Sequence, residues 1–145
     1  TSDQSQLYAL RTKLADPSTA IVLPEVISKE PLGPVVRQGD DAWFNIVKWS
    51  LFAMVNAEEM GITSANVDEM KTSTNPAIAR FVGTEGDAGA KLGLGADWAA
   101  MIIKQVGNYG EAFERNVGMD TPLQISRGLN ALWSKGGIQY APPIR

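Results

Sequence analysis

The sequence contains no cysteine and no histidine among its 145 residues. The absence of cysteine excludes disulfide bonds and thiolate nucleophiles, and the absence of both residue types excludes zinc sites built from them. Without histidine, the most common general base at neutral pH is also missing. Enzyme classes that depend on these groups are therefore excluded, and the sequence indicates neither a cofactor nor a metal site.

Long apolar runs and runs of basic residues are missing as well. No stretch approaches the roughly 18–20 apolar residues that a membrane-spanning helix needs. The formal net charge is −3 and the basic residues are scattered, which argues against a nucleic-acid-binding protein, because such a protein needs a basic surface. The first residues show no signal-peptide pattern and no initiator methionine. We therefore expect that the chain was processed or begins inside a longer protein.

The overall composition is that of a folded domain. Hydrophobic residues make up 44% of the chain and charged residues 20%, which is close to the average for globular proteins. A length of 145 residues is enough for one domain with a hydrophobic core. Disorder over most of the chain is therefore not expected.

Helical periodicity and capping residues predict a helix-rich chain. The strongest pattern runs from about Ala42 to Glu59, where apolar residues occur on almost every side, so we expect neighbours to bury this helix on several faces. Asp40 or Asp41 would cap its start, and Gly61 stands where a left-handed C-terminal cap is expected. Further helices are expected over residues 3–14, 64–71, 76–81, 97–106 and 109–116, and after residue 122.

Two short segments are expected to be extended. Residues 20–27 and 35–37 are rich in Ile, Val and Leu, although Pro24 would place the first segment at a sheet edge or interrupt it. A connector rich in proline and glycine separates them, and residues 136–145 form an extended tail. Because two strands alone make a marginal sheet, we expect their sheet partners to lie outside this chain.

The glycine-rich stretch over residues 83–95 is best interpreted as a surface loop. A phosphate-binding loop ends in Lys-Ser or Lys-Thr at the start of a helix, but here Lys91 is followed by Leu92. Glu85 and Asp87 could bind calcium, but the spacing of an EF-hand is absent.

Three pairs of acidic residues raise the alternative of a carboxylate-based hydrolase. A glycosidase needs two carboxylates that face each other across a cleft, whereas adjacent or helix-spaced acids usually form a solvated face. The solvated face is the favoured interpretation, and the four tryptophans are most simply core or packing residues. The acidic pairs are Glu58/Glu59, Asp68/Glu69 and Glu111/Glu114.

Asp3 precedes the first predicted helix. From the residues alone, its carboxylate is interpreted as a helix cap. A carboxylate at the start of a helix can also bind an ammonium group, and this second role becomes relevant through a family resemblance.

Six stretches of the sequence occur together and in the same order in one known family. They are TSDQSQLYALR (residues 1–11), LPEVISKEPLGP (23–34), GNYGE (107–111), RNVG (115–118), RGLNALW (127–133) and GGIQYAPP (136–143). With these motifs the chain resembles the general L-amino-acid-binding periplasmic proteins of ABC transporters, within the type II periplasmic binding protein family. The resemblance covers essentially the whole chain, and its motifs are long and unusual.

The resemblance implies an α/β fold of two lobes joined by two crossing strands. This chain would be the helix-rich C-terminal part of that fold, with few short strands. Residues 1–29 would end lobe 2 and approach the hinge, residues 30–71 would return to lobe 1 with the buried helix 42–59, and residues 72–145 would form a helical extension with an extended tail. The N-terminal portion of the family pattern has no counterpart here.

The resemblance also implies a function without catalysis. The full-length protein would capture L-amino acids in the periplasm by closing its lobes and would deliver them to the permease of an ABC transporter. Asp3 matches the carboxylate that binds the α-ammonium group of the ligand. A fragment without its sheet partners would expose apolar surface, so we expect self-association. The alternatives that remain open are the hydrolase and a helical interaction module without a small-molecule ligand.

Overall fold

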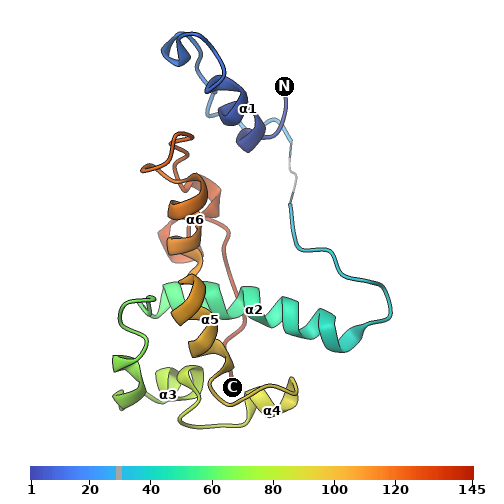
Figure 1. The fold of residues 1–145 in the computed structure, drawn as a ribbon, viewed down its shortest axis with the longest axis vertical. Coiled ribbons are helices and arrows are strands. Elements are labelled where there is room, and N and C mark those ends of the chain that lie inside the picture. Colours follow the sequence, from blue (N-terminus) through green and yellow to red (C-terminus); the bar gives the residue numbers. More distant parts are fainter. Residues whose placement is uncertain (29–30) are drawn as a thin grey trace.

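A computed structural model describes residues 1–28 and 31–145, and helices dominate these residues (Figure 1). Within the described ranges no residue belongs to a β-strand, and one isolated parallel bridge joins Leu132 and Gln139. The predicted helix-rich fold class is confirmed. The α-helices are α1 (Gln4–Arg11), α2 (Asp41–Glu59), α3 (Pro76–Val82), α4 (Ala88–Lys91), α5 (Trp98–Val106) and α6 (Tyr109–Val117). The 3₁₀ helices are η1 (Pro17–Thr19), η2 (Glu69–Thr72), η3 (Gly128–Asn130) and η4 (Trp133–Lys135).

The long helix α2 begins and ends where its capping residues predict. The Asp40 carboxylate accepts a hydrogen bond from the backbone N–H of Trp43 at 3.0 Å. At the other end, Gly61 has a φ of 69°, and the N–H of Ile62 donates to the carbonyl of Ala57 at 2.8 Å. This return bond is typical of a Schellman motif, which needs a residue with positive φ.

Two predicted helices are largely replaced by turns. In the range 64–71 the structure has a turn and then η2, because the side chain of Asn66 accepts a hydrogen bond from the backbone N–H of Thr63 at 2.7 Å and so competes with helical bonding. After residue 122, Gln124 and Gly128 both have positive φ, and the described residues there form only the short 3₁₀ helices η3 and η4.

The two segments predicted to be extended do not form strands. Residues 20–27 and 35–37 have no strand assignment, and residues 21–28 and 31–36 make no backbone–backbone hydrogen bonds among the described residues. The physical reason is that an extended segment needs a neighbouring strand for its backbone groups, and this part of the chain supplies none. The boundary at residues 29 and 30, where the second lobe would end, lies outside the described residues.

The core lies where the second half of α2 packs against α5 and α6. Its buried side chains come from α2, α3, α5 and the loops between them, and from the C-terminal tail. Ile144 is 7% exposed and belongs to this cluster, while Ala141 packs with Val55 and Leu132 in a smaller one. The predicted extended tail is therefore part of the core packing. The fully buried large side chains are Phe81, Ile62, Ile103, Leu132, Val67 and Val82.

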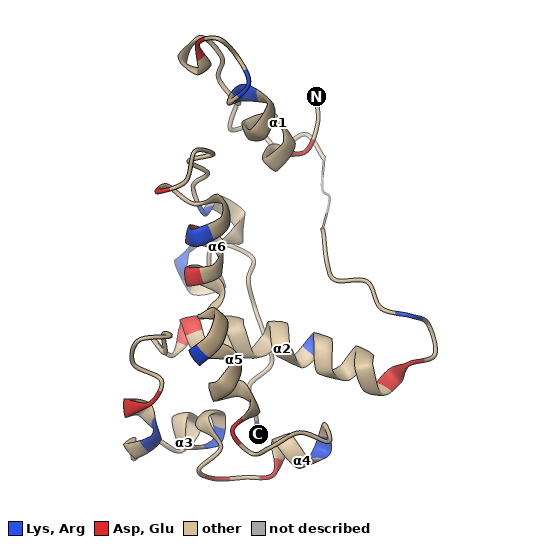
Figure 2. Cartoon of the chain, viewed as in Figure 1, with Lys and Arg blue, Asp and Glu red and all other residues tan. Residues whose placement is uncertain are grey.

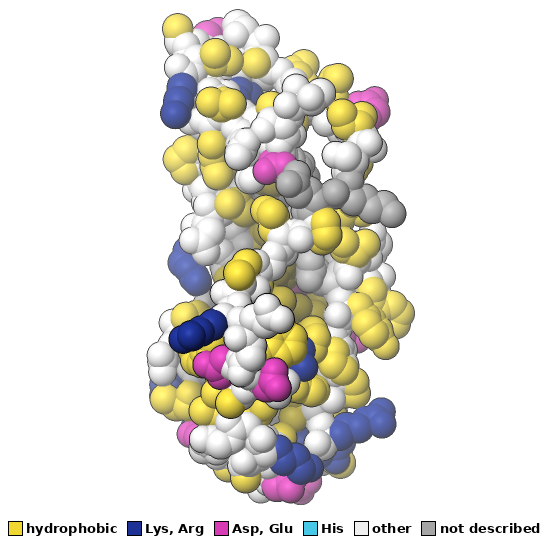
Figure 3. All heavy atoms as spheres, turned by 90° about the vertical axis from the view of Figure 1, so that its right-hand side faces the viewer, with side chains coloured by type: hydrophobic (Ala, Val, Ile, Leu, Met, Phe, Trp, Pro, Cys, Tyr) yellow, Lys and Arg dark blue, Asp and Glu magenta, His cyan; other side chains and the backbone are white. Residues whose placement is uncertain are grey.

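The first half of α2 and the segment before it remain open to solvent in this chain. Trp43 is 52% exposed and Phe44 is 47% exposed, so the predicted burial of the whole helix is seen only in its second half. Figure 1 shows α1 at one end of the molecule and an extended connector leading back to α2. Figure 3 looks at the side on which this connector lies, and apolar side chains cover much of that face. The exposed apolar residues before α2 include Ile21, Leu23, Val26, Ile27, Leu32 and Val35.

Candidate functional site

Asp3 occupies the N-cap position of α1, but its side chain does not act as a cap. Its backbone carbonyl accepts the N–H of Leu7 at 3.0 Å, whereas its carboxylate makes no capping hydrogen bond. The ion pairs found among the described residues do not include Asp3 either. The structural role that the residues alone favoured is therefore not seen, and the ligand-binding role stays a prediction.

The surroundings of Asp3 are partly open to solvent, and Asp3 itself is half-buried. Helix α1 buries none of its residues, and Leu10 on this helix is 55% exposed. The other polar contacts of α1 are local: the Ser2 hydroxyl donates to the side chain of Gln6, and the Arg11 guanidinium lies over the ring of Tyr8. A binding site at Asp3 that excludes water needs a second protein surface facing the N-terminus of α1.

The first two acidic pairs bind neighbouring groups and do not face each other across a cleft. The Glu58 carboxylate forms an ion pair with Arg127 at 2.9 Å, while Glu59 accepts a hydrogen bond from the indole of Trp133 at 3.2 Å. Asp68 forms ion pairs with Lys104 and Lys71 at 2.8 and 3.1 Å. The hydrogen bond from Lys104, and then that from Lys71, holds the pKa of Asp68 below its ordinary value.

Glu111 joins α6 to the loop after α2. Its carboxylate accepts hydrogen bonds from the backbone N–H and the hydroxyl of Ser64, the latter at 2.6 Å. It also accepts the N–H of Asn108 at 2.8 Å, and Asn108 accepts the N–H of Glu111, which completes a capping box. Partial burial acts to raise the pKa of Glu111, but the hydrogen bonds from Ser64 and Asn108 outweigh it, so the pKa lies below its ordinary value.

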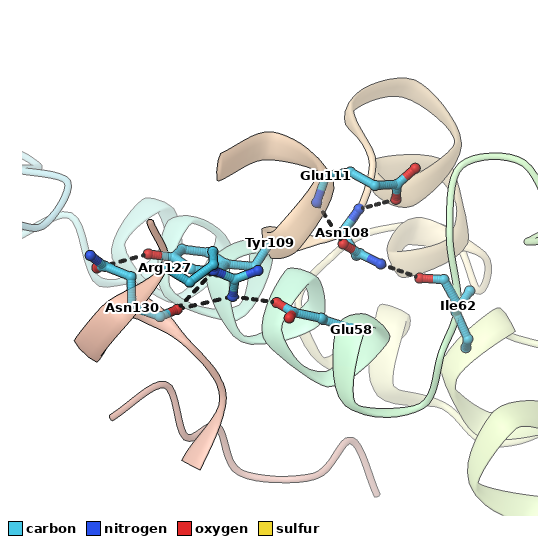
Figure 4. A network of polar contacts seen from close by, with 7 residues as sticks. All are labelled: Glu58, Ile62, Asn108, Tyr109, Glu111, Arg127 and Asn130. Carbon is cyan, nitrogen blue, oxygen red and sulfur yellow. Dashed lines mark hydrogen bonds and ion pairs between the residues drawn. The ribbon is translucent and has the colours of Figure 1, made fainter. Parts of the chain in front are cut away.

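A network around Arg127 was not predicted from the sequence (Figure 4). The Arg127 guanidinium donates to Glu58 and to the carbonyl of Asn130, each at 2.9 Å. It also lies over the rings of Tyr109 and Phe113, at 5.4 and 5.2 Å from their centres. Burial raises the pKa of the Tyr109 hydroxyl, although the charge of Arg127 opposes this shift. The network fastens the end of α2 to α6 and η3.

One residue of this network stands in a motif that is visible in the sequence. Arg127 begins the RGLNALW motif, but its partner Glu58 lies 69 residues earlier. No local spacing connects the two. Figure 2 shows that charged residues of both signs are interspersed along the chain, so charge pattern alone does not single out this pair.

The glycine-rich stretch over residues 83–95 is only partly the predicted surface loop, because α4 forms within it and buries Gly89. Gly83 ends α3 with a φ of 81°, and a β-carbon there would lie 2.1 Å from the backbone oxygen of Ala96, so glycine is needed for close packing. Asp87 pairs with Lys91 at 2.9 Å on the exposed side of α4. Residues 1–28 and 31–145 contain no group of three or more Asp or Glu residues that could hold a metal ion.

Two further features concern the surface and the membrane. A trough of about 500 Å³ is lined by residues 37–42 alone. Because a single continuous segment forms it, it is an open bend of the chain and not a cleft between elements. None of the helices in the described ranges has the length and apolar character needed to cross a membrane.

Known proteins resemble the chain over its full length. No family model matches the sequence. The general L-amino acid-binding periplasmic protein AapJ of Rhizobium johnstonii is 67% identical over 100% of this chain, and the glutamate/glutamine/aspartate/asparagine-binding protein BztA of Rhodobacter capsulatus is 53% identical over 100% of it. A solved ABC transporter periplasmic binding protein from Brucella ovis, with glutathione bound, is 57% identical over 99% of this chain with a TM-score of 0.93. The chain spans 43% of the length of each of the two curated relatives and 46% of the solved chain.

Proposed function

We infer that this chain, which belongs to the periplasmic amino-acid-binding proteins of ABC transporters, forms the C-terminal part of a receptor that captures L-amino acids for import. The observation that carries this proposal is 67% identity over the whole chain to a general L-amino acid-binding protein. Nothing in the comparisons or in the contacts of the acidic pairs supports a hydrolase or a ligand-free interaction module. The receptor would act in the periplasm and would deliver its ligand to the membrane permease of the transporter.

The exposed apolar segments support the proposed division of the chain. Residues 1–29 would end one lobe and reach the hinge, residues 30–71 would return to the other lobe, and residues 72–145 would extend that lobe. Residues 21–28 and 31–36 leave their backbone groups unpaired within the described chain, as expected for strands whose partners lie elsewhere in the polypeptide. The relatives are more than twice as long as this chain, which leaves enough residues for the missing sheet.

The proposed binding step uses Asp3 as an anchor for the ligand ammonium group. Its carboxylate caps no helix and forms no ion pair among the described residues, so it can accept a charge-assisted hydrogen bond, which is about twice as strong as a neutral one. Because helix α1 buries none of its residues, water is excluded from this hydrogen bond only when another lobe closes over it. Ligand binding would then select the closed state, which the permease recognises.

Calorimetry on the polypeptide that carries this sequence, expressed at its natural length, tests the proposal. The titrants are L-glutamate, L-glutamine, L-aspartate, L-asparagine and glutathione, the ligand types that appear in the names of the relatives. Asp3→Asn should weaken the binding of the preferred ligand by about 1.5–3 kcal/mol, the range for a hydrogen bond to a charged group.

Asp16→Asn is the matched control. Asp16 is an exposed aspartate outside α1, and its side-chain oxygen accepts a hydrogen bond from the N–H of Ser18 at 2.9 Å, which asparagine can preserve. It should leave affinity unchanged. Equal affinities for the wild type and Asp3→Asn would exclude the anchor role, and the absence of binding to every titrant would contradict the amino-acid receptor itself.

The isolated 145-residue chain should self-associate. Its exposed connector and the first half of α2 present apolar side chains and unpaired backbone groups to solvent, and such surfaces readily pair with another chain. Light scattering should therefore give a mass above that of the 15.6 kDa monomer. If the chain stays monomeric at high concentration, these exposed apolar surfaces do not drive self-association.

A further inference from the structure

A second concave site lies in the helical body, between α2, α4, α5 and the C-terminal tail. It is separate from α1 and Asp3. Its volume is about 140 Å³. Its lining is formed mainly by Trp49, Trp98, Leu92 and Ile144, with Lys91 and Arg145 as the charged members.

The apolar walls of this cavity are held by the core. Trp98 is 8% exposed and Ile144 is 7% exposed, and the ring of Trp49 packs edge-on against Phe52 at 5.5 Å. Gly89 fixes the remaining wall: a β-carbon at this position would lie 2.2 Å from the backbone oxygen of Gly95 and 3.0 Å from the Trp98 ring. Helix α4 therefore lies directly on the start of α5, and the cavity is formed before any ligand arrives.

The volume limits what can enter. A buried cavity of about 150 Å³ in another protein binds benzene, whereas pockets for drug-sized ligands measure about 300–1,000 Å³. A space of about 140 Å³ that both indoles help to line is thus large enough for one six-membered ring. Aromatic rings pack well edge-on or offset against such neighbours.

The two cationic side chains beside the cavity favour a ligand with a negative charge. Lys91 and Arg145 are both exposed beside the apolar walls. Lys91 pairs with Asp87, but the two side chains are 66% and 69% exposed. An ion pair that is so exposed to solvent contributes little free energy. Its ammonium group can therefore turn to another carboxylate at small cost. We propose that this cavity is an accessory binding site for an aromatic monocarboxylate with a single ring, which inserts the ring between Trp49 and Trp98 and directs its carboxylate to Lys91 and Arg145.

Phenylacetate is the probe that tests this site, in the polypeptide expressed at its natural length. The indole N–H signals of Trp43, Trp49, Trp98 and Trp133 are followed by NMR and assigned by Trp→Phe substitutions. Phenylacetate should shift the signals of Trp49 and Trp98 and leave the other two unchanged. Lys91→Gln should raise the Kd by up to about fivefold, the effect of one exposed charge pair. The neutral probe phenylacetamide should bind at least as weakly to the wild type as phenylacetate binds to Lys91→Gln, because it loses the attraction of both cations.

Three variants make the result specific. Ala88→Leu should fill part of the cavity and abolish the shifts, while Lys135→Gln, which removes an exposed lysine outside the cavity, should not alter the Kd. Asp3→Asn should also leave phenylacetate binding unchanged, which separates this site from the amino-acid site. Unmoved Trp49 and Trp98 signals, equal shifts at all four indoles, or an unchanged Kd in Lys91→Gln would each overturn the proposal.

Discussion

The side-chain amide of Asn56 in α2 donates a hydrogen bond to the backbone carbonyl of Pro142 at 2.8 Å, although 86 residues separate the two. Asn56 is 8% exposed and also donates to the carbonyl of Phe52 at 2.9 Å. Between Ala141 and Ile144, which are both buried, this bond ties the tail to the long helix. The last residues of the tail are thus held by this polar contact and by the burial of Ala141 and Ile144, while residues 137–139 make backbone hydrogen bonds to residues 129–133.

Asn56→Ala should lower the free energy of unfolding by about 1 kcal/mol, the net contribution of a typical hydrogen bond, because the partly buried bond to the carbonyl of Pro142 is lost. Urea denaturation measures this change. Asn116→Ala is the control, since Asn116 makes the same type of bond to the carbonyl four residues earlier but on an exposed surface. Its effect should stay within about 0.5 kcal/mol, and similar losses in both variants would show that the contact with the tail contributes nothing.

Arg127→Met should destabilise the fold by about 3 kcal/mol, near the lower end of the range for breaking a buried ion pair. The side chains of Arg127 and Glu58 are 19% and 11% exposed, so the substitution leaves a carboxylate largely out of water without its partner. Thermal and urea denaturation should agree on the loss. Lys91→Gln breaks an exposed pair instead and should cost less than about 1 kcal/mol. An equally small effect of Arg127→Met would mean that the network is loosely formed.

The hydrogen bonds at Glu111 predict part of the acid sensitivity of the fold. The pKa of Glu111 is lowered in the folded state from its ordinary value of 4.5, so its contribution to stability is present above that value and is lost as the pH falls through the folded-state pKa. Glu111→Gln should therefore destabilise the chain at neutral pH and make its stability fall less steeply on acidification. Denaturation midpoints measured across this range test the difference.

Glu85→Gln provides the comparison for that experiment, because the Glu85 side chain makes no hydrogen bond among the described residues. It should follow the wild-type pH dependence. If the stability of Glu111→Gln shows the same pH dependence as that of the wild type, the hydrogen bonds from Ser64 do not favour the charged form of the Glu111 carboxylate.

Tryptophans 43 and 49 should respond differently to truncation. Trp49 packs against the core, so Trp49→Ala should cost about 3 kcal/mol, the low end of the range for a large buried aromatic residue. Trp43 is 52% exposed, so Trp43→Ala should change the stability of the isolated chain by no more than about 0.5 kcal/mol. In the natural-length polypeptide Trp43→Ala should cost clearly more, because the proposed lobe covers that face. The same small value in both contexts would argue against the division at residues 30–71.

Local signals predicted most of the α-helices, although the helices expected over residues 64–71 and after residue 122 form only short 3₁₀ helices, and α4 was not predicted. Asp40 and Gly61 delimit α2 as expected, and Asn75 caps α3 through the N–H of Ala77. These signals act within a few residues, so they do not depend on the rest of the fold. The segments over residues 20–27 and 35–37 failed as strands because a strand depends on a partner, which the described chain lacks.

The contacts between distant residues could not be predicted in this way. The pairing of Glu58 with Arg127 and that of Asn56 with Pro142 span 69 and 86 residues. Neither pair has a spacing that distinguishes it from other polar residues. The candidate ligand contact at Asp3 was identified through a family motif alone, since a carboxylate before a helix is otherwise interpreted as a cap.

The position of Ala141 and Ile144 in the core has a consequence for biosynthesis. When a ribosome has translated residue 130, all residues of α1 to α6 have been made, yet three buried side chains of the two clusters do not exist, namely Leu132, Ala141 and Ile144. The helical body therefore reaches its final packing only after residue 144 emerges. Until then we expect the nascent chain to stay loosely packed.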